Sequence, residues 1–392
     1  MRMLRGVDQW LWGYLASVGR RRRTNGPRHV LLSIADHFEP FQRTILADGT
    51  ITGGATASAA RAAVEAWCAD YAACVEGLHD ADGCSPRHSV FYPWDEYDPG
   101  CLDRLAGFCR DGHGEVELHL HHRADTAEGL RQKLDACRET YAGRHGLLGR
   151  TADGAARYAF VHGNWALCNA RPDGDWCGVD RELAILRTTG CYADFTFPSA
   201  PSPTQPRIVN AIYYGRDPRP GERGHRPLKV ENRKSKVESQ KSEIGNRKSD
   251  CGLLMVQGPL GLNWRSRKAG VFPRFENGEI SAANPATASR MALWQRLQVH
   301  VAGRPEWIVV KLHTHGMSER SRGGVVGPAM RRFHEQIASA AGGDKTPGGT
   351  VLHYVTAREL VNIIRAAEAG HAGNPGDWRD YELAPPPCGV RG

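Results

Sequence analysis

The stretch Glu115-Val116-Glu117-Leu118-His119-Leu120-His121-His122-Arg123 combines a strand pattern with three histidines. Apolar and polar side chains alternate up to Leu120, and this period of two predicts a β-strand. The imidazoles gather where the strand ends, and neutral imidazole is the commonest protein ligand for Zn²⁺ and related ions. The stretch therefore predicts a metal site at the carboxyl end of a strand.

Strand-like segments alternate with helix-like segments along the rest of the chain. The strand candidates are 29–35, 88–94, 115–120, 158–163, 191–197, 252–257, 307–313 and 350–355. Several are continuously apolar, as expected for parallel strands that are buried on both faces. We expect an α/β fold with parallel strands, formed as a distorted barrel of seven or eight β/α units, because polar residues end at least three strands and barrels collect their sites there.

Helix predictions rest on apolar spacing and on capping residues. Segment 126–142 carries an apolar stripe, with Asp125 as its expected N-cap. Asn284-Pro285 predicts a cap followed by a proline at the first helical position of the next helix. Segments 56–78 and 356–369 complete the set of predicted helices.

Three parts are expected along the chain: a basic arm with a short helix over 1–27, one catalytic domain over 28–370, and an irregular tail over 371–392. The apolar stretch of the arm is much shorter than the ~20 residues of a membrane span. We expect its helix to pack on the domain surface, with a helix at a membrane interface as the alternative. Residues 231–250 are almost devoid of apolar side chains and predict a disordered insertion.

Composition indicates an ordinary globular protein. The chain has 392 residues, a net charge of +8 and 41% hydrophobic residues. The positive charge is scattered, so we expect no nucleic-acid partner. Eleven cysteines occur without a Cys-x-x-Cys pair. Reduced, mostly buried thiols in a cytoplasmic protein without a transmembrane segment fit this pattern best.

Two further strand ends carry residues suited to a metal site. Asp36 follows the strand at 29–35, and a carboxylate there is a natural ligand. We expect Asp36, His119 and either His121 or His122 to hold one divalent cation. A histidine that leaves the strand at 307–313 can act as a general acid, which makes His313 and His315 catalytic candidates, together with Glu39.

Aromatic and polar residues beside these strand ends suit contacts with a sugar. The candidates for substrate binding are His37, His162, Asn164, Trp165 and Asp194. The same residue types also occur at ordinary barrel rims, so their pattern alone leaves both readings open.

In this order, the motifs resemble those of the polysaccharide deacetylase family, the carbohydrate esterases with a nodulation-type deacetylase domain. That family ends its first strand with two acidic residues, a base and then a metal ligand; here Asp36 matches the ligand and Ala35 stands at the base position. Its second motif, Glu-Ile-Gly-x-His, is similar to the segment ending in His119. Its last motif, Leu-x-Leu-His, is similar to the segment ending in His313, where the family has the acid that protonates the leaving amine.

The resemblance implies a metal-dependent hydrolase that cleaves the amide of an acetylated sugar, polysaccharide or small molecule, with Zn²⁺ as the expected metal. The second histidine of the family's second motif would fall at Arg123, so His121 or His122 would take its place. Glu39, His37 or Asp125 could replace the base that Ala35 lacks. The alternative is a non-catalytic descendant of the same barrel that binds a glycan or serves assembly. An amidohydrolase is less favoured, because that class carries its His-x-His pair on the first strand.

Overall fold

The computed structural model describes residues 7–24, 26–228, 252–301, 303–341 and 349–389. The insertion predicted at 231–250 lies outside these ranges. The cysteines within them are free thiols, most of them buried, as expected from the sequence.

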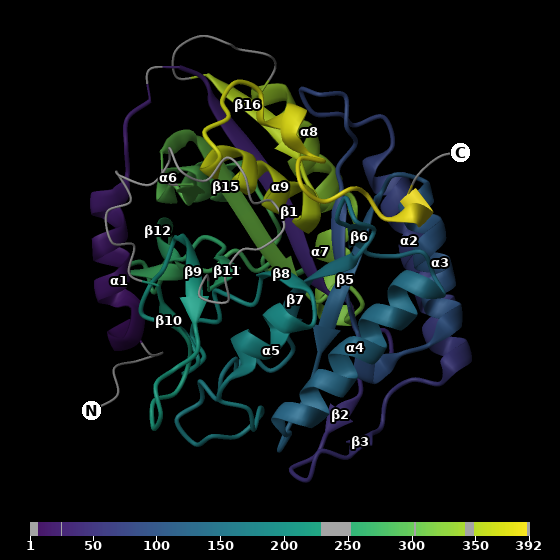
Figure 1. The fold of residues 1–392 in the computed structure, drawn as a ribbon. Coiled ribbons are helices and arrows are strands. Elements are labelled where there is room, and N and C mark those ends of the chain that lie inside the picture. Colours follow the sequence, from purple (N-terminus) through teal and green to yellow (C-terminus); the bar gives the residue numbers. More distant parts are fainter. Residues whose placement is uncertain (1–6, 25, 229–251, 302, 342–348, 390–392) are drawn as a thin grey trace.

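One large, mostly parallel sheet organises the described residues (Figure 1). Its parallel strands are β1 (Arg28–His37), β4 (His88–Pro93), β5 (Gly114–Leu120), β7 (Ala156–His162), β8 (Cys191–Asp194), β11 (Leu253–Val256), β15 (Arg304–Thr314) and β16 (Thr350–Tyr354). Antiparallel strands at its margins are β6 (Gly149–Arg150), β9 (Ile212–Arg216), β10 (Arg226–Pro227) and β14 (His300–Val301). All eight predicted strands are thus confirmed.

The strand order is β10-β9-β11-β8-β7-β5-β4-β1-β15-β14, with β6 beside β7. Strand β1 is central, because it pairs with β15 on one side and on the other with β16 and then β4. Two small hairpins lie outside this sheet: β2 (Thr44–Ile45) with β3 (Ile51–Thr52), and β12 (Gly261–Lys268) with β13 (Phe272–Glu276).

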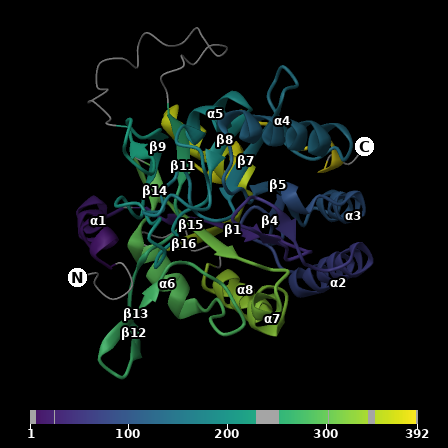
Figure 2. The same cartoon turned by 90° about the horizontal axis from the view of Figure 1, so that it is seen from below.

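Helices surround the strands when the molecule is viewed from below (Figure 2). They are α1 (Val7–Arg20), α2 (Ala57–Val75), α3 (Pro99–Arg110), α4 (Ala127–Gly143), α5 (Glu182–Thr188), α6 (Ala288–Leu297), α7 (Glu319–Val325), α8 (Pro328–Ala340) and α9 (Ala357–Glu368). Short 3₁₀ turns occur at Trp94–Glu96, Pro375–Trp378 and Pro387–Gly389. The helices predicted from the sequence correspond to α2, α4, α6 and α9.

Two helix starts differ from the sequence prediction. The N-cap of α4 is Thr126 rather than Asp125, because the Thr126 side chain accepts a hydrogen bond from the backbone N–H of Gly129. The N-cap of α6 is Thr287, which accepts from the N–H of Arg290, so the helix begins after Asn284-Pro285. In both places a threonine closer to the helix fills the capping position.

The two faces of the sheet belong to different hydrophobic clusters. On β1, Val30, Leu32 and Ile34 pack with the outer helices, whereas Leu31 and Ala35 pack with α9. This follows from the strand period, because successive side chains point to opposite faces. The same alternation decides which polar residues at the strand ends can meet.

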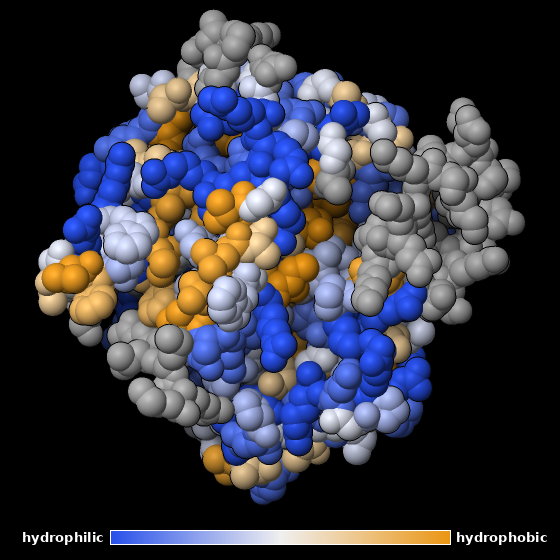
Figure 3. Space-filling model, turned by 90° about the vertical axis from the view of Figure 1, so that its left-hand side faces the viewer, coloured by the Kyte–Doolittle hydropathy of each residue, from blue (hydrophilic) through white to orange (hydrophobic). Residues whose placement is uncertain are grey.

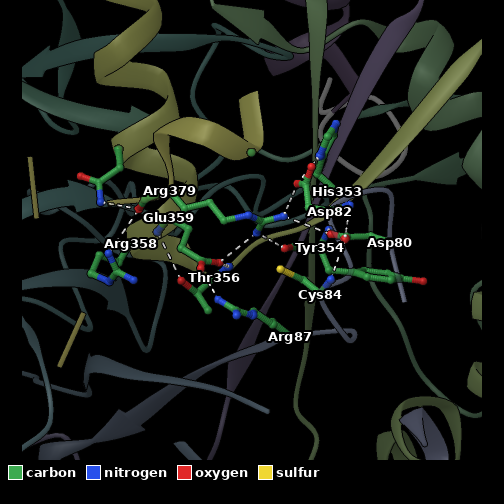
Figure 4. A network of polar contacts seen from close by, with 12 residues as sticks. Asp80, Asp82, Cys84, Arg87, His353, Tyr354, Thr356, Arg358, Glu359 and Arg379 are labelled. Atoms are coloured by element: carbon green, nitrogen blue, oxygen red, sulfur yellow. Dashed lines mark hydrogen bonds and ion pairs between the residues drawn. The ribbon is translucent and has the colours of Figure 1, made fainter. Parts of the chain in front are cut away.

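The C-terminal segment is fixed to the amino-terminal side of the sheet by a buried arginine (Figure 4). Arg379 lies 3.0 Å from Asp80, 2.9 Å from Asp82 and 3.4 Å from Glu359. Asn362 of α9 also donates to the carbonyl oxygen of Arg379 at 2.6 Å. The described part of the expected tail is therefore packed against the sheet domain, although it has little regular structure.

Replacement of Arg379 by methionine should lower the free energy of unfolding by about 3–5 kcal/mol, because buried carboxylates then lack their cation. Urea unfolding followed by circular dichroism measures the change. Arg171→Met is the matched control, since Arg171 pairs with Asp173 at the surface, where a pair contributes about 1 kcal/mol or less. Equal effects of the two substitutions would contradict the role given to Arg379.

Asp98 provides a pH-dependent contribution to stability. Its carboxylate caps α3 and accepts two hydrogen bonds from Arg61, and the Arg61 side chain lowers the pKa of Asp98 from 3.8 to about 2. Because the folded pKa is the lower one, the contribution is fully present above pH 3.8 and is lost as the pH falls toward 2. Asp98→Asn keeps a capping oxygen but should cost about 1 kcal/mol at neutral pH. Urea titrations should show the difference from wild type shrinking between neutral pH and pH of about 2.5; a constant difference would contradict this.

Candidate metal centre

Strand register brings the predicted site residues to one edge of the sheet. Ala35 is paired with His313 between β1 and β15, and Pro93 is paired with His119 between β4 and β5. Leu120 of β5 is paired with His162 of β7. The carboxyl ends of five neighbouring parallel strands therefore lie together, which is where α/β folds bind their ligands.

Five side chains form the histidine pocket, the name used below for His37, Glu39, His119, His121 and His315. Ligand atoms of His37, Glu39 and His315 lie within 4.8 Å of one another, as do those of Glu39, His119 and His121. Glu39 belongs to both groups and lies at their junction. Such a set of imidazoles around one carboxylate could hold a metal ion.

Glu39 faces two imidazole nitrogens at once. Its Oε1 lies 3.2 Å from Nε2 of His119 and 3.3 Å from Nε2 of His121. The other nitrogen of each ring already has an acceptor: Nδ1 of His119 is 3.1 Å from the carbonyl oxygen of Val161, and Nδ1 of His121 is 3.0 Å from Asp95. In a neutral ring with its proton on Nδ1, the lone pair of Nε2 points at the carboxylate, and a cation between them removes this repulsion.

The pKa values of His119 and His121 are shifted in opposite directions in the histidine pocket. Burial lowers the pKa of His119, and Glu39 offsets this only in part. Burial also opposes charge on His121, but Asp95 and Glu39 outweigh it and hold the pKa of His121 well above its ordinary value. Burial, His315 and His119 together keep the pKa of His37 well below its ordinary value. The pocket thus favours neutral, ligand-competent rings at His37 and His119.

The hydrogen-bond partners of the rings match those of metal-bound histidines. Metal ligands usually donate their second N–H to a backbone carbonyl or a carboxylate, which fixes the tautomer. Val161 and Asp95 are placed for these two roles. Among the described residues, Nδ1 of His37 in the pocket and Nε1 of the nearby Trp165 are buried without a hydrogen-bond partner.

A cleft of about 200 Å³ adjoins the histidine pocket. His121, Asp95 and Asn164 are among the residues that line it. The β2–β3 hairpin supplies Ile45, and Trp176 also lines the cleft. The cleft therefore offers polar groups, an apolar wall and an aromatic ring next to the candidate metal ligands.

Asp36 requires a correction. The sequence places it with His119 around one ion, but adjacent residues on a strand point to opposite faces, and His37 is the one on the His119 side. Asp36 instead accepts hydrogen bonds from the N–H of Gly316 at 2.6 Å and from His88, whose Nε2 is 2.8 Å away. Glu39 and His37 stand near His119 where Asp36 was expected.

His122 also lies outside the histidine pocket. It belongs to the buried quartet, the name used below for His122, His162, Cys177 and Glu182, whose ligand atoms lie within 4.8 Å of one another and could hold a metal ion. Of the two histidines that the sequence left open, His121 is therefore the one that accompanies His119.

The tautomer of His162 makes the quartet the weaker metal site. Nδ1 of His162 accepts a hydrogen bond from the backbone N–H of Asn164 at 3.2 Å, so a neutral ring carries its proton on Nε2. A metal ligand needs an unprotonated nitrogen. Glu182 has partners without an ion, because it lies 3.1 Å from Nε2 of His122 and accepts from the N–H of Cys168.

A third group, Asp80, Asp82 and His353, also has the composition of a metal site. Arg379 already supplies a cation to both carboxylates, at 3.0 and 2.9 Å. Of the three groups found in the described residues, the histidine pocket has the best-oriented donors.

The remaining predicted residues lie at different depths. Asn164 lines the cleft, and the Trp165 ring lies 6.2 Å from that of His37 between centroids. His162 and Asp194 are buried, and neither is among the residues that line the cleft. Asp194 accepts a hydrogen bond from the side chain of Thr196 at 2.7 Å. Contact of these two residues with a substrate stays a prediction.

Sequence reasoning missed Asp95, Cys177 and Glu182. Asp95 is a carboxylate that directly follows the predicted strand 88–94, so the reasoning applied to Asp36 could have identified it. Cys177 and Glu182 lie in and just after the long loop between β7 and α5, where no periodicity announces which residues turn inward.

Comparisons with known proteins leave the function to the geometry. No protein-family model matches this chain, and no curated protein matches it significantly. None of the helices in the described ranges has the length and apolar content needed to cross a membrane.

Divalent metal should bind at the histidine pocket. After treatment with a chelator, wild-type protein should take up Zn²⁺ in isothermal titration calorimetry, and His119→Ala should lose this binding. Asp95→Asn should weaken it by about 10–100-fold, because Asp95 orients His121. His79→Ala, at an exposed histidine outside the metal-site groups, is the control and should bind like wild type; unchanged binding by His119→Ala would contradict the assignment.

Proposed function

We propose that the protein is a metal-dependent hydrolase that removes the acetyl group from an N-acetylated carbohydrate. The observation that carries the proposal is that Oε1 of Glu39 lies within 3.3 Å of Nε2 of both His119 and His121. The Nδ1 atoms of these rings are held by the carbonyl oxygen of Val161 and by Asp95. This is the arrangement of a preorganised cation site. The motif resemblance supplies the reaction class.

Zn²⁺ is the metal that best suits these donors, because imidazole and carboxylate ligands in a low-coordinate site favour it. When bound, such an ion polarises an acyl carbonyl and makes its water a nucleophile near neutral pH. His119, His121 and Glu39 would hold it, with His37 and His315 as further ligands or as hydrogen-bond partners of the substrate. His315, a catalytic candidate from the sequence, is thus proposed to bind the metal or the substrate.

His313 takes the catalytic proton role in this proposal. Burial, with Lys311 close by, holds the pKa of His313 well below its ordinary value, so the ring is neutral at physiological pH. Its Nδ1 has no hydrogen-bond partner among the described residues. A neutral imidazole can accept a proton from the attacking water and return it to the leaving nitrogen. One group then serves both as the acid expected from the motif and as the base that Ala35 lacks.

The cleft beside the histidine pocket suits a sugar. Arg43 and Asn164 offer hydrogen-bond donors for hydroxyl groups, and Trp176 offers a ring for an apolar sugar face. These features support the carbohydrate class over a purely apolar acyl substrate.

The distorted barrel expected from the sequence forms part of the proposal. Nζ of Lys311 on β15 donates to the carbonyl oxygens of Phe195 and Phe197, which follow β8. Gly258, two residues beyond β11, approaches the carbonyl oxygen of Lys311 so closely that a Cβ there would lie 2.3 Å from it. These contacts join the two margins of the parallel strands at the carboxyl edge, which supports closure there.

Acetate release tests the function. Metal-loaded wild type should release acetate from an N-acetylated glucosamine oligosaccharide, and His313→Asn should reduce kcat by about 10²–10⁴-fold because a positioned acid–base group is lost. Bound metal, measured by elemental analysis, should be unchanged in this variant.

Two outcomes would overturn the proposal in different ways. Metal-loaded wild type that binds the oligosaccharide without releasing acetate would favour the non-catalytic glycan-binding alternative, for which Ala35 is the sequence support. Acetate release that His313→Asn leaves unchanged would assign the proton transfer to another residue.

A further inference from the structure

A second surface has features that the proposed hydrolase does not explain. It consists of α1 and the β12–β13 hairpin, called here the apolar-basic face. Trp12 is 75% exposed and Leu15 50% on α1, and Trp264 is 57% and Phe272 69% exposed on the hairpin. Most of the exposed large hydrophobic side chains of the described residues lie on these two elements. Figure 3 shows apolar side chains gathered in a band on this face, with strongly hydrophilic ones around it.

The orientation of α1 is fixed by its other side. The Trp10 ring packs edge-on against Phe275 of β13 at 5.4 Å between centroids, and Asn210 donates to the Ser17 hydroxyl at 3.2 Å. Gly13 lies so close to the carbonyl oxygen of Arg207 that a Cβ would not fit. Because these residues anchor one face of α1, the opposite face with Trp12 and Leu15 is held outward.

The helix and the hairpin form one continuous unit. Trp10, Leu260 and the partly buried Leu262 and Phe275 share a small hydrophobic cluster with α1. This cluster is separate from the two cores of the sheet. The hairpin stands away from the body of the molecule in Figure 2. Val271 and Phe272, at the turn between β12 and β13, are 64% and 69% exposed.

Charge on the face is mostly positive. Residues 261–276 contain four basic residues and one acidic one, Glu276, which is buried and paired with Arg290. Residues 7–24 contain four arginines and one acidic residue, Asp8. Arg22, Arg265 and Arg267 are exposed. Exposed aromatic and aliphatic side chains flanked by arginine are the composition of surfaces that bind at the boundary of anionic lipid bilayers.

We propose that the apolar-basic face docks the protein on an anionic lipid bilayer. The tryptophan and phenylalanine rings enter the boundary between headgroups and acyl chains, and the arginines contact lipid phosphates. A nucleic acid fits less well, because Leu15, Val18 and Val271 are aliphatic and gain nothing from base stacking. A second copy of the chain fits less well, because two faces of like charge would meet.

Vesicle sedimentation tests the proposal with the full chain. Wild type should sediment with vesicles of equal parts phosphatidylcholine and phosphatidylglycerol, and much less with phosphatidylcholine alone. Trp264→Ser/Phe272→Ser should weaken the binding by roughly tenfold or more, since two apolar side chains no longer leave water. Arg265→Gln/Arg267→Gln should weaken it by about fivefold per arginine at low salt. Raising salt from about 0.1 M to about 0.5 M should weaken wild-type binding.

Leu46→Ser/Tyr381→Ser is the matched control, because it removes two exposed apolar side chains outside the apolar-basic face. It should bind vesicles like wild type. Absence of wild-type binding to anionic vesicles, or an equal loss in the control, would overturn the proposal. Binding to a single-stranded oligonucleotide without binding to vesicles would also overturn it. Acetate release is measured separately, so failure of this docking leaves the hydrolase proposal untouched.

Discussion

The carboxylate of Glu39, which faces the Nε2 atoms of His119 and His121, is the constraint on which the candidate site depends. Nδ1 of His119 is hydrogen-bonded to the carbonyl oxygen of Val161, and Nδ1 of His121 is hydrogen-bonded to Asp95. Neither ring can turn its Nδ1 proton toward Glu39 without losing that bond. A neutral His119 therefore turns a lone pair toward the carboxylate, and this contact becomes favourable when a cation lies between them. At His121 the raised pKa already places a proton between Nε2 and Glu39, and a bound metal ion would take the place of that proton.

The fold creates this constraint by aligning strand ends. β1 contributes His37 at its end and Glu39 just beyond it, β5 contributes His119, and β15 leads to His313 and His315. No two of these segments are close in sequence, and their meeting depends on parallel pairing in register. The buried Arg379 network acts at the opposite end, where it holds the C-terminal segment and α9 against the amino-terminal side of the sheet.

Much of this was predictable from the sequence because strand patterns are local. Continuous apolar runs and, at 115–120, strict alternation predicted all eight parallel strands. Residue type at the strand ends pointed to the carboxyl edge of the sheet, where His37, Glu39, His119 and His121 lie close together. The prediction neglected that successive side chains of a strand point to opposite faces of the sheet. His37 and His119 lie on the same face, so Asp36, next to His37, lies on the opposite face. The pair His121 and His122 illustrates the limit, since the backbone after Leu120 is no longer a strand and its alternation stops there.

Residues in and next to loops were the part of the candidate sites that the sequence did not predict. Cys177 and Glu182 meet His122 through a loop whose backbone includes left-handed residues such as Trp165 and Trp176, and no periodic pattern specifies such a path.

The measurement that tests the central claim most directly is anomalous scattering at the zinc edge from crystals of the metal-loaded protein. The account predicts a peak about 2.0–2.2 Å from Nε2 of both His119 and His121. A peak only within the buried quartet, or none at the histidine pocket, would contradict it.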